Sequence, residues 1–267
     1  MYSSSFHPQN PLPTVLVFAA SDPVAGAGMQ ADLLTLAALG CHPATAITAL
    51  TVQDTVGVAS VHPVAAALVD RQARAVLADM PVAAFKIGVL GSVENARVVA
   101  AIAADYPHIP LTLDPVLASG RGDKFADDEL IAALIAYLFP RATLLTPNSV
   151  EAYRLTAADK PEQAVARLLS FGVQHVLLTG GHESGDTVCN RLYSANGLLC
   201  EEGWQRLAGE FHGSGCTLAS ACAAGLAQGQ DIVSAARAAQ QYTWQSLARA
   251  FRPGRGQSIP NRLFHDA

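Results

Sequence analysis

Short apolar runs alternate along this chain with longer segments in which apolar residues recur at helical spacing. The first run, residues 14–20, is almost entirely apolar, as strands buried on both faces of a sheet are. It ends in Ser21-Asp22-Pro23, and a Gly-rich turn at 26–28 then opens a helix expected over 29–39. The N-terminal unit is therefore predicted to be a strand, a Gly-rich turn and a helix.

The same rhythm continues along the chain. Alternating strands and helices predict a mostly parallel sheet with helices on both faces, and such sheets bind ligands beyond the carboxyl ends of their strands. Further strands are expected at 44–50, 83–90, 109–113, 143–145 and 173–178, and further helices at about 63–80, after 91–92, near 127–139, after 213–215 and over 231–251.

One pair of segments departs from this rhythm. Residues 187–193 and 198–201 flank a turn that contains Asn196-Gly197, which predicts an antiparallel hairpin. The expected fold class is therefore α/β, with a mostly parallel central sheet flanked by helices and a hairpin edge in the C-terminal half. We expect one domain over 14–252, between a disordered leader at 1–13 and a C-terminal tail at 253–267.

Composition narrows the partners that this fold can have. The net charge is −5 and the 17 basic residues form no cluster, which argues against nucleic acid. The longest apolar run, 130–139, stops at Pro140 and is too short to cross a membrane. The leader before residue 14 contains no Lys or Arg, unlike a signal or transit peptide. We expect no membrane association.

Cysteine usage points to a compartment. The five cysteines are an odd number and include no C-x-x-C pair, which argues against both a disulfide framework and a zinc site. A reducing cytoplasm is the expected location.

Candidate chemistry begins at the turn Gly213-Ser214-Gly215, which precedes an Ala- and Leu-rich helix. Small residues at a helix N-terminus leave backbone N–H groups uncovered, and such a site attracts anions. Cys216 follows the turn directly, where the helix dipole favours a thiolate or any developing negative charge. The alternative is a tight turn before a buried helix that contains one core cysteine.

Two other nucleotide-binding patterns were weighed. Residues 26–31 match the dinucleotide fingerprint G-x-G-x-x-A, which leaves a nicotinamide oxidoreductase as a rival interpretation. That fingerprint requires an acid at the end of the second strand, about 20 residues later. Here the second strand ends in Thr51-Val52-Gln53, and Asp54 lies farther along. A Walker P-loop is excluded because no Gly-Lys pair occurs in the chain.

Carboxylates follow two of the predicted strands. Asp114 directly follows the strand at 109–113, and Asn148 and Glu151 lie at i and i+3 at the start of a helix. Taken singly, they fit a solvated loop acid and a helix cap with its capping-box partner. Because strand ends meet at one sheet edge, together with the Gly-rich turn they predict a nucleotide phosphoryl-transfer site.

From about Val15 to Ala248 the chain resembles the ribokinase-like kinases and, within them, the hydroxymethylpyrimidine/phosphomethylpyrimidine kinase (ThiD) family of thiamine synthesis. The motifs that carry the resemblance are Ser21-Asp-Pro-x-x-Gly-Ala-Gly-x-Gln-Ala-Asp32, Ile47-Thr-Ala-Leu-Thr-x-Gln53, Lys86-Ile-Gly88, Asp114-Pro-Val116, Thr146-Pro-Asn-x-x-Glu-Ala152, Gly180-Gly-His182 and His212-Gly-Ser-Gly-Cys-Thr-Leu218.

This resemblance implies transfer of the ATP γ-phosphate to 4-amino-5-hydroxymethyl-2-methylpyrimidine, to its monophosphate, or to both, with Mg²⁺ as cofactor and a homodimer as the usual assembly. It implies that Cys216 is the base or proton relay and that the Gly213, Ser214 and Gly215 amides hold the developing charge. The residues implied on the substrate are Gln53, which reads the aminopyrimidine edge, and Ala27, Val89 and Val116, which line the ring. The residues implied for ATP and magnesium are Asp114, Asn148, Glu151, Thr179 and Gly181, with the metal near Asp114 and Glu151.

The chain also departs from the pattern of that family. Ala20, Val24 and Ala25 replace Gly, Ser and Gly in the first motif. Lysines common near position 120 and at position 179 are missing, and Arg121 is the candidate replacement for the first. Two alternatives therefore stay open: a pyridoxal/pyridoxine kinase, which has the same fold and also phosphorylates a hydroxymethyl group, and a non-catalytic pyrimidine or nucleotide binder.

Overall fold

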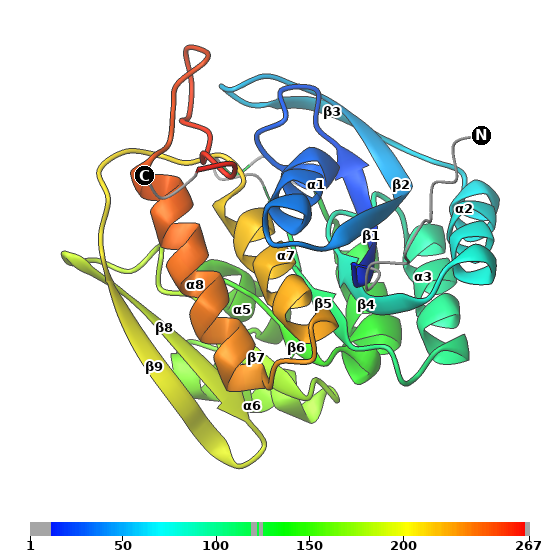
Figure 1. Cartoon of the computed structure of the whole chain (residues 1–267). Helices are drawn as coiled ribbons and strands as arrows, with labels where there is room; N and C mark the ends of the chain where they lie inside the picture. Colours follow the sequence, from blue (N-terminus) through cyan, green and yellow to red (C-terminus); the bar gives the residue numbers. More distant parts are fainter. Residues whose placement is uncertain (1–11, 119–121, 123–124, 265–267) are drawn as a thin grey trace, which may run out of the picture.

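A single mixed sheet of nine strands forms the centre of the molecule (Figure 1). The computed structural model describes residues 12–118, 122 and 125–264. The strand order is β3-β2-β1-β4-β5-β6-β7-β8-β9, and neighbours from β2 to β7 run parallel. The strands are β1 (Thr14–Ser21), β2 (His42–Gln53), β3 (Val58–Pro63), β4 (Val82–Ile87), β5 (Leu111–Leu113), β6 (Leu144–Leu145), β7 (His175–Leu178), β8 (Thr187–Ser194) and β9 (Gly197–Gln205).

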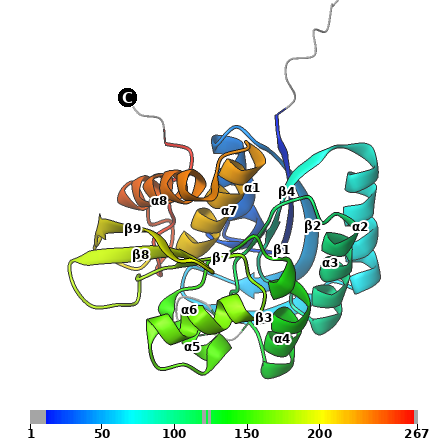
Figure 2. The same cartoon turned by 90° about the horizontal axis from the view of Figure 1, so that it is seen from below.

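Helices cover both faces of this sheet (Figure 2). Helices α1, α7 and α8 pack together on one face, and α2 to α6 lie on the other. The helices are α1 (Gly28–Ala38), α2 (Ala66–Asp79), α3 (Val93–Asp105), α4 (Asp128–Ala133), α5 (Ser149–Thr156), α6 (Pro161–Ser170), α7 (Ser214–Ala227) and α8 (Ile232–Ala248). The predicted fold class is confirmed, including the antiparallel hairpin β8–β9.

Strand β1 shows why the central strands read as continuous apolar runs. Side chains alternate across a strand, so Leu16 and Phe18 join the core under α2 and α3 while Val15 and Val17 join the core under α1 and α7. All four are at most 1% exposed. Each face of the sheet therefore has its own apolar core.

The sequence pattern missed the opposite edge of the sheet. Strand β3 pairs antiparallel with β2, where only a connection to the next helix was expected. The Asp54 carboxylate accepts hydrogen bonds from the N–H groups of Val56 and Gly57, and this tight turn sends the chain back along β2. Strand β2 accordingly extends to Gln53, and the helix expected from residue 63 begins at Ala66. The helix expected near 127–139 consists of α4, a π-helical turn at Leu134–Leu138 and a 3₁₀ turn at Phe139–Arg141.

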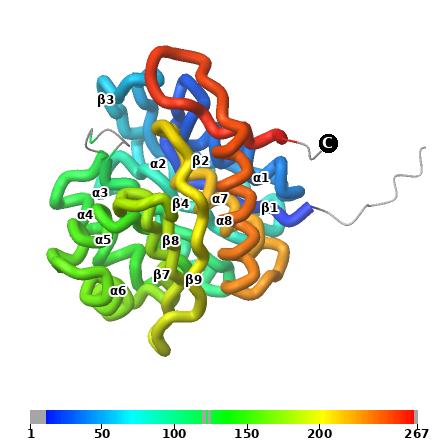
Figure 3. Tube along the Cα trace, turned by 90° about the vertical axis from the view of Figure 1, so that its left-hand side faces the viewer, coloured from blue at the N-terminus to red at the C-terminus, as the bar shows by residue number. Residues whose placement is uncertain are grey.

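The segment after α8, which was expected to be a tail beyond residue 252, packs against the domain (Figure 3). Ser258 bridges to Phe211 just before α7, and the N–H groups of Gly256 and Gln257 donate to Thr55 in the β2–β3 turn. The side chain of Arg262 is buried. The expected leader lies, up to residue 11, outside the described residues. No helix in the described part of the chain is long and apolar enough to span a bilayer.

Candidate active site

A cavity of about 590 Å³ opens beyond the carboxyl ends of the parallel strands, at the N-terminus of α7. Apart from Arg121, which lies outside the described residues, every residue given a site role from the sequence lines this one cavity. They are Ala27, Gln53, Val89, Asp114, Val116, Asn148, Glu151, Thr179, Gly181, Gly213, Ser214, Gly215 and Cys216.

The turn before α7 is shaped for close backbone approach. Gly213 is the N-cap in the left-handed region (φ 82°), and no side chain caps the first N–H groups of the helix. A Cβ atom at Gly213 would lie 2.0 Å from the Gly26 carbonyl oxygen, and a Cβ at Gly26 would lie 2.1 Å from the His212 ring. Glycine is therefore required at both positions, because the turn and the loop after β1 touch backbone to backbone.

Asp22 holds the loop after β1 in place. Its carboxylate accepts from the N–H groups of Val24, Gly26 and Ala27 at 2.7–3.0 Å, and the His212 Nε2 atom lies 2.9 Å away. Burial raises the pKa of Asp22, but the hydrogen bonds from His212 and the loop amides outweigh burial and lower it below the usual value. An ionised Asp22 thus ties the loop to the turn before α7.

A fully buried ion pair borders the cavity, with Lys86 in the cavity lining. Lys86 Nζ lies 2.9 Å from Asp32, and the Ser220 hydroxyl donates to the same carboxylate at 2.7 Å. Burial lowers the pKa of Lys86, but the charges of Asp32 and Asp114 outweigh burial and raise it above its usual value, so the ammonium stays protonated. The sequence analysis gave Lys86 no role. A lysine within the apolar strand β4 was the available signal, because lysine is almost never buried without a partner.

Asp114, which is buried, and Glu151, which is half-buried, form a second acid cluster without such a partner. Burial raises the pKa of Asp114 to about 6, although the Lys86 charge opposes the shift. Burial and the Asp114 charge raise the pKa of Glu151 to about 8. The Asp114 Oδ2 and Thr146 Oγ1 atoms are buried without a hydrogen-bond partner. Among the described residues, no Lys or Arg side chain forms an ion pair with either carboxylate.

Glu151 also has a structural role as the capping-box partner of Asn148. Its carboxylate accepts from the Asn148 N–H at 3.0 Å, and the Asn148 side chain accepts from the Glu151 N–H at 2.9 Å. This is a complete capping box at the start of α5. The cap fixes both side chains at the cavity wall, so the structural and the functional interpretation are compatible.

Cys216 carries a neutral thiol in this environment. Burial raises its pKa to about 12, although the Lys86 charge and a hydrogen bond from the Gly28 N–H both lower it. The interaction with this thiol lowers the pKa of Asp114. The expectation that the helix dipole favours a thiolate is therefore wrong for this state, because burial outweighs it.

Gln53 ends β2 with part of its amide free. Its Nε2 donates to Thr51 Oγ1 at 2.8 Å, while its Oε1 is buried without a partner. The Thr51 hydroxyl in turn donates to the Ser21 carbonyl at 2.8 Å. The amide is thereby positioned by the same strand end that starts the Asp22 loop.

The sequence analysis did not predict the far end of the cavity, between β9 and α8. Trp204 and Trp244 pack with ring centroids 6.2 Å apart, and Trp204 Nε1 donates to Gln240. The Arg206 guanidinium donates to the carbonyls of Gly181, Glu183 and Gly185, and so shapes the loop after β7. This end combines flat apolar faces with amide groups.

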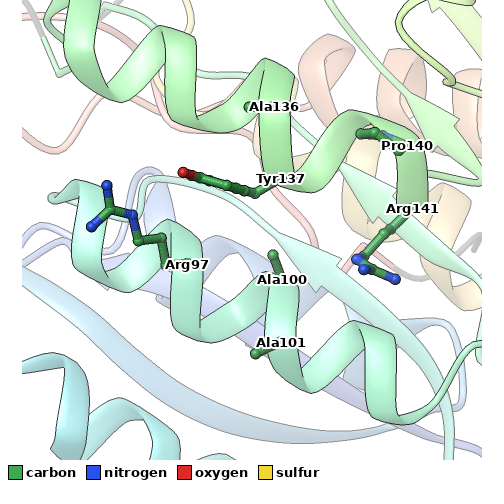
Figure 4. Close-up of a pocket in the computed structure, with 7 residues that line it drawn as sticks. All are labelled: Arg97, Ala100, Ala101, Ala136, Tyr137, Pro140 and Arg141. Carbon is green, nitrogen blue, oxygen red and sulfur yellow. The ribbon is translucent and has the colours of Figure 1, made fainter.

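A second hollow, of about 330 Å³, lies between α3 and the π-helical turn (Figure 4). Arg97 and Arg141 lie at its two ends, and the Arg97 guanidinium carbon is 5.7 Å from the centre of the Tyr137 ring. No residue predicted from the sequence lines it.

Comparison with known proteins decides the family. A family model described as phosphomethylpyrimidine kinase matches residues 22–261. This chain belongs to the phosphomethylpyrimidine kinase family. It is thus a kinase, and the nicotinamide interpretation of the Gly26–Ala31 stretch is wrong.

Individual relatives agree with this assignment. The kinase is 41% identical over 264 residues to the hydroxymethylpyrimidine/phosphomethylpyrimidine kinase of Mycobacterium tuberculosis H37Rv, which covers 94% of each chain. It is similar in structure to a phosphomethylpyrimidine kinase from Clostridium difficile 630 (TM-score 0.76, 31% identity, 88% of this chain and 99% of that one). It is also similar to a Staphylococcus aureus pyridoxal kinase in complex with pyridoxal (TM-score 0.84, 27% identity, 94% of each chain).

Proposed function

We propose that this kinase transfers the γ-phosphate of ATP to the hydroxymethyl group of 4-amino-5-hydroxymethyl-2-methylpyrimidine, to its monophosphate, or to both, in the synthesis of thiamine. The observation that carries the proposal is the juxtaposition, in one cavity, of a glutamine amide with an unpartnered oxygen, an uncapped helix N-terminus and an acid pair with an unpartnered carboxylate oxygen. These three features match the ring, the transferred phosphoryl group and the metal of such a reaction.

Gln53 is the residue proposed to recognise the ring. An amide presents one acceptor and one donor side by side, which matches the amino group and the adjacent ring nitrogen of an aminopyrimidine. Its unpartnered Oε1 is the atom that would accept from the amino group. Ala27, Val89 and Val116 supply the apolar walls of the same cavity.

The turn at Gly213–Cys216 is proposed to receive the transferring phosphoryl group. The first N–H groups of α7 have no side-chain cap, and the Lys86 ammonium lines the same cavity. Phosphoryl transfer depends mainly on positioning and on stabilising the charge of the transition state. A rigid turn with preorganised donors supplies both.

Cys216 is proposed to act as a proton relay rather than as a free thiolate base. Its neutral thiol interacts with Asp114, whose pKa of about 6 keeps it ionised at neutral pH. As the acceptor hydroxyl attacks phosphorus, its proton passes to Sγ while the thiol proton passes to Asp114. No thiolate accumulates, and no covalent enzyme intermediate forms.

The residues present fit Mg²⁺ and ATP. Among the described residues no group of three or more His, Cys, Asp or Glu side chains surrounds a metal position, so the protein does not supply a complete cage. Mg²⁺ in kinases commonly takes one or two carboxylates together with phosphates and water. Asp114 and Glu151, beside the unpartnered Thr146 hydroxyl, would hold the ion, which neutralises phosphate charge when bound.

The remaining ATP contacts are proposed at the far end of the cavity. Thr179, Gly181 and Asn148 would contact the triphosphate, and the faces of Trp204 and Trp244 suit a nucleobase. No lysine replaces the one missing at position 179, and Arg121 lies outside the described residues. Arg206 lines this end, although carbonyl groups already occupy its donors.

Location and assembly are also part of the proposal. All five cysteines are free thiols, which suits a reducing cytoplasm. Leu50, Val52 and Val56 on the β2–β3 ribbon are between 39% and 54% exposed and form an apolar strip suited to a homodimer contact. Size measurement in solution tests the second point, because a monomer at micromolar concentration would contradict it.

The substrate is tested by ADP release with three acceptors: hydroxymethylpyrimidine, its monophosphate and pyridoxine. We expect turnover with at least one of the two pyrimidines and a kcat/KM for pyridoxine that is lower. Turnover with pyridoxine alone would assign the chain to the pyridoxal kinases, whose structural likeness makes them the second candidate. ATP binding without turnover on any acceptor would support a non-catalytic binder.

A further inference from the structure

Arg262 lies in the C-terminal segment and is the most deeply buried arginine of the described chain. It is 2% exposed. The Tyr242 hydroxyl donates to its carbonyl at 2.7 Å, and the Asn261 N–H donates to the Ser246 carbonyl at 3.0 Å. These bonds dock the segment on α8 and direct the Arg262 side chain toward the turn before α7.

Within the described part of the chain, the guanidinium hydrogen-bonds only to uncharged oxygens. Its Nε donates to Thr217 Oγ1 at 2.9 Å, and its Nη2 donates to the carbonyls of Gly26 at 2.5 Å and Gly213 at 3.4 Å. Its Nη1 lies 3.5 Å from the Ala25 carbonyl. A buried charge normally pairs with an opposite charge, because removing it from water is costly. This cation has no such partner in direct contact.

The position of this charge is tied to the phosphate turn. The Gly213 carbonyl accepts from Arg262, from the Thr217 N–H at 3.0 Å and from the Thr217 hydroxyl at 2.8 Å. The same peptide unit carries the Ser214 N–H, the first amide of α7. Donors at the carbonyl end polarise a peptide, so its N–H becomes a stronger donor to an anion. The Arg262 charge therefore acts on the carbonyl side of this peptide, opposite the N–H group that faces the anion.

We propose that Arg262 is a positioning residue for phosphoryl transfer, which holds the loop at 25–27 against the turn at 213–216 and provides, behind its amides, a positive charge that the phosphates neutralise. This inference rests on the proposed kinase function. It makes the C-terminal segment part of the active-site scaffold.

The test compares Arg262→Met and Arg262→Lys with the wild type. Arg252→Gln is the matched control, because Arg252 lies in the same segment, is exposed and donates to the Arg255 carbonyl. We expect Arg262→Met to lower kcat about 10- to 100-fold, as loss of an outer contact to a preorganised site does. Arg262→Lys recovers part of the rate, added methylguanidinium raises the rate of Arg262→Met, and Arg252→Gln behaves as the wild type.

A purely structural role gives a different result. Arg262→Met would then lose rate only in proportion to its unfolded fraction at the assay temperature, and methylguanidinium would have no effect. Either that result or an unchanged kcat overturns the inference.

Calorimetric binding of ADP, with and without Mg²⁺, separates this inference from the proposed function. If the wild type turns over none of the acceptors, the proposed function fails, but Arg262→Met is still expected to bind ADP about tenfold more weakly. Equal ADP affinity of the folded variant and the wild type overturns the role of Arg262.

Discussion

Two buried acid clusters lie against the same cavity and differ in one respect, the presence of a cation. Asp32 has Lys86 at 2.9 Å and the Ser220 hydroxyl at 2.7 Å. Asp114 and Glu151 are buried together, and Asp114 keeps an oxygen without a partner. The first cluster is a finished structural element. The second has raised pKa values because burial and the charges of neighbouring carboxylates disfavour ionisation.

The largest expected effect breaks the finished cluster. Lys86→Met leaves the Asp32 carboxylate buried without its counter-charge, so the free energy of unfolding should fall by about 3–5 kcal/mol. Urea unfolding measures this. The double variant Lys86→Met/Asp32→Asn should regain much of the loss, because no uncompensated charge remains.

Lys160→Met serves as its control, because Lys160 is exposed and its substitution should change stability by no more than about 0.5 kcal/mol. A Lys86→Met variant as stable as this control would contradict the interpretation of the buried pair.

Cys216→Ala tests the chemistry next to the open cluster. Removing the relay should lower kcat about 100-fold or more while the melting temperature changes little. Cys222→Ala is the matched control, since Cys222 is buried in the same helix but does not line the cavity. Full activity of Cys216→Ala would rule out a relay through the thiol.

A smaller expected effect is the dependence of stability on pH. In the metal-free protein the pKa of Glu151 is raised from 4.5 to about 8, so the folded state keeps a proton that the unfolded state releases. The contribution of Glu151 to stability should therefore be greatest below about pH 4.5 and be lost as pH rises toward 8.

Glu151→Gln should make this decline shallower and should be more stable than the wild type at pH 8 in EDTA. Gln also serves in a capping box, so the cap of α5 is kept. Urea midpoints at pH 5 and pH 8 give the comparison. Parallel pH profiles of the two proteins would show that Glu151 is ionised in the folded state.

The smallest expected effect concerns Ala25 in the loop after β1. Ala25 has φ 56°, in the left-handed region, where the resembled family has glycine. Ala25→Gly removes this strain, but glycine also gives the unfolded chain more conformational entropy, which lowers stability. The net result should be a variant more stable than the wild type by about 0.5–1 kcal/mol. A lower midpoint for Ala25→Gly would show that the loop is not strained at this position.

The sequence predicted those parts of the molecule whose signals are local. A Gly-rich turn before an apolar helix, and an acid directly after an apolar strand, were enough to predict that Gly213–Cys216, Asp114 and Glu151 lie at one sheet edge. Strand β3 was missed because it is short, and its pairing depends on the turn at Asp54 rather than on an apolar period.

Other parts depend on contacts between distant segments, which no sequence pattern reveals. Arg262 meets Gly26 and Gly213 only through the docked C-terminal segment. Likewise, the neutral thiol of Cys216 follows from burial among Asp114 and Lys86, whereas its place after the turn alone suggested a thiolate.

The central proposal is that Asp114 and Glu151 bind a cation. Calorimetric titration of the protein at pH 7 with Mg²⁺ and a non-hydrolysable ATP analogue, in two buffers of different ionisation enthalpy, counts the protons released on binding. Because the pKa of Glu151 is raised to about 8 in the protein alone, binding should release about one proton, and Glu151→Gln should abolish the release. The same heat in both buffers for the wild type, or an unchanged release in Glu151→Gln, would contradict the account.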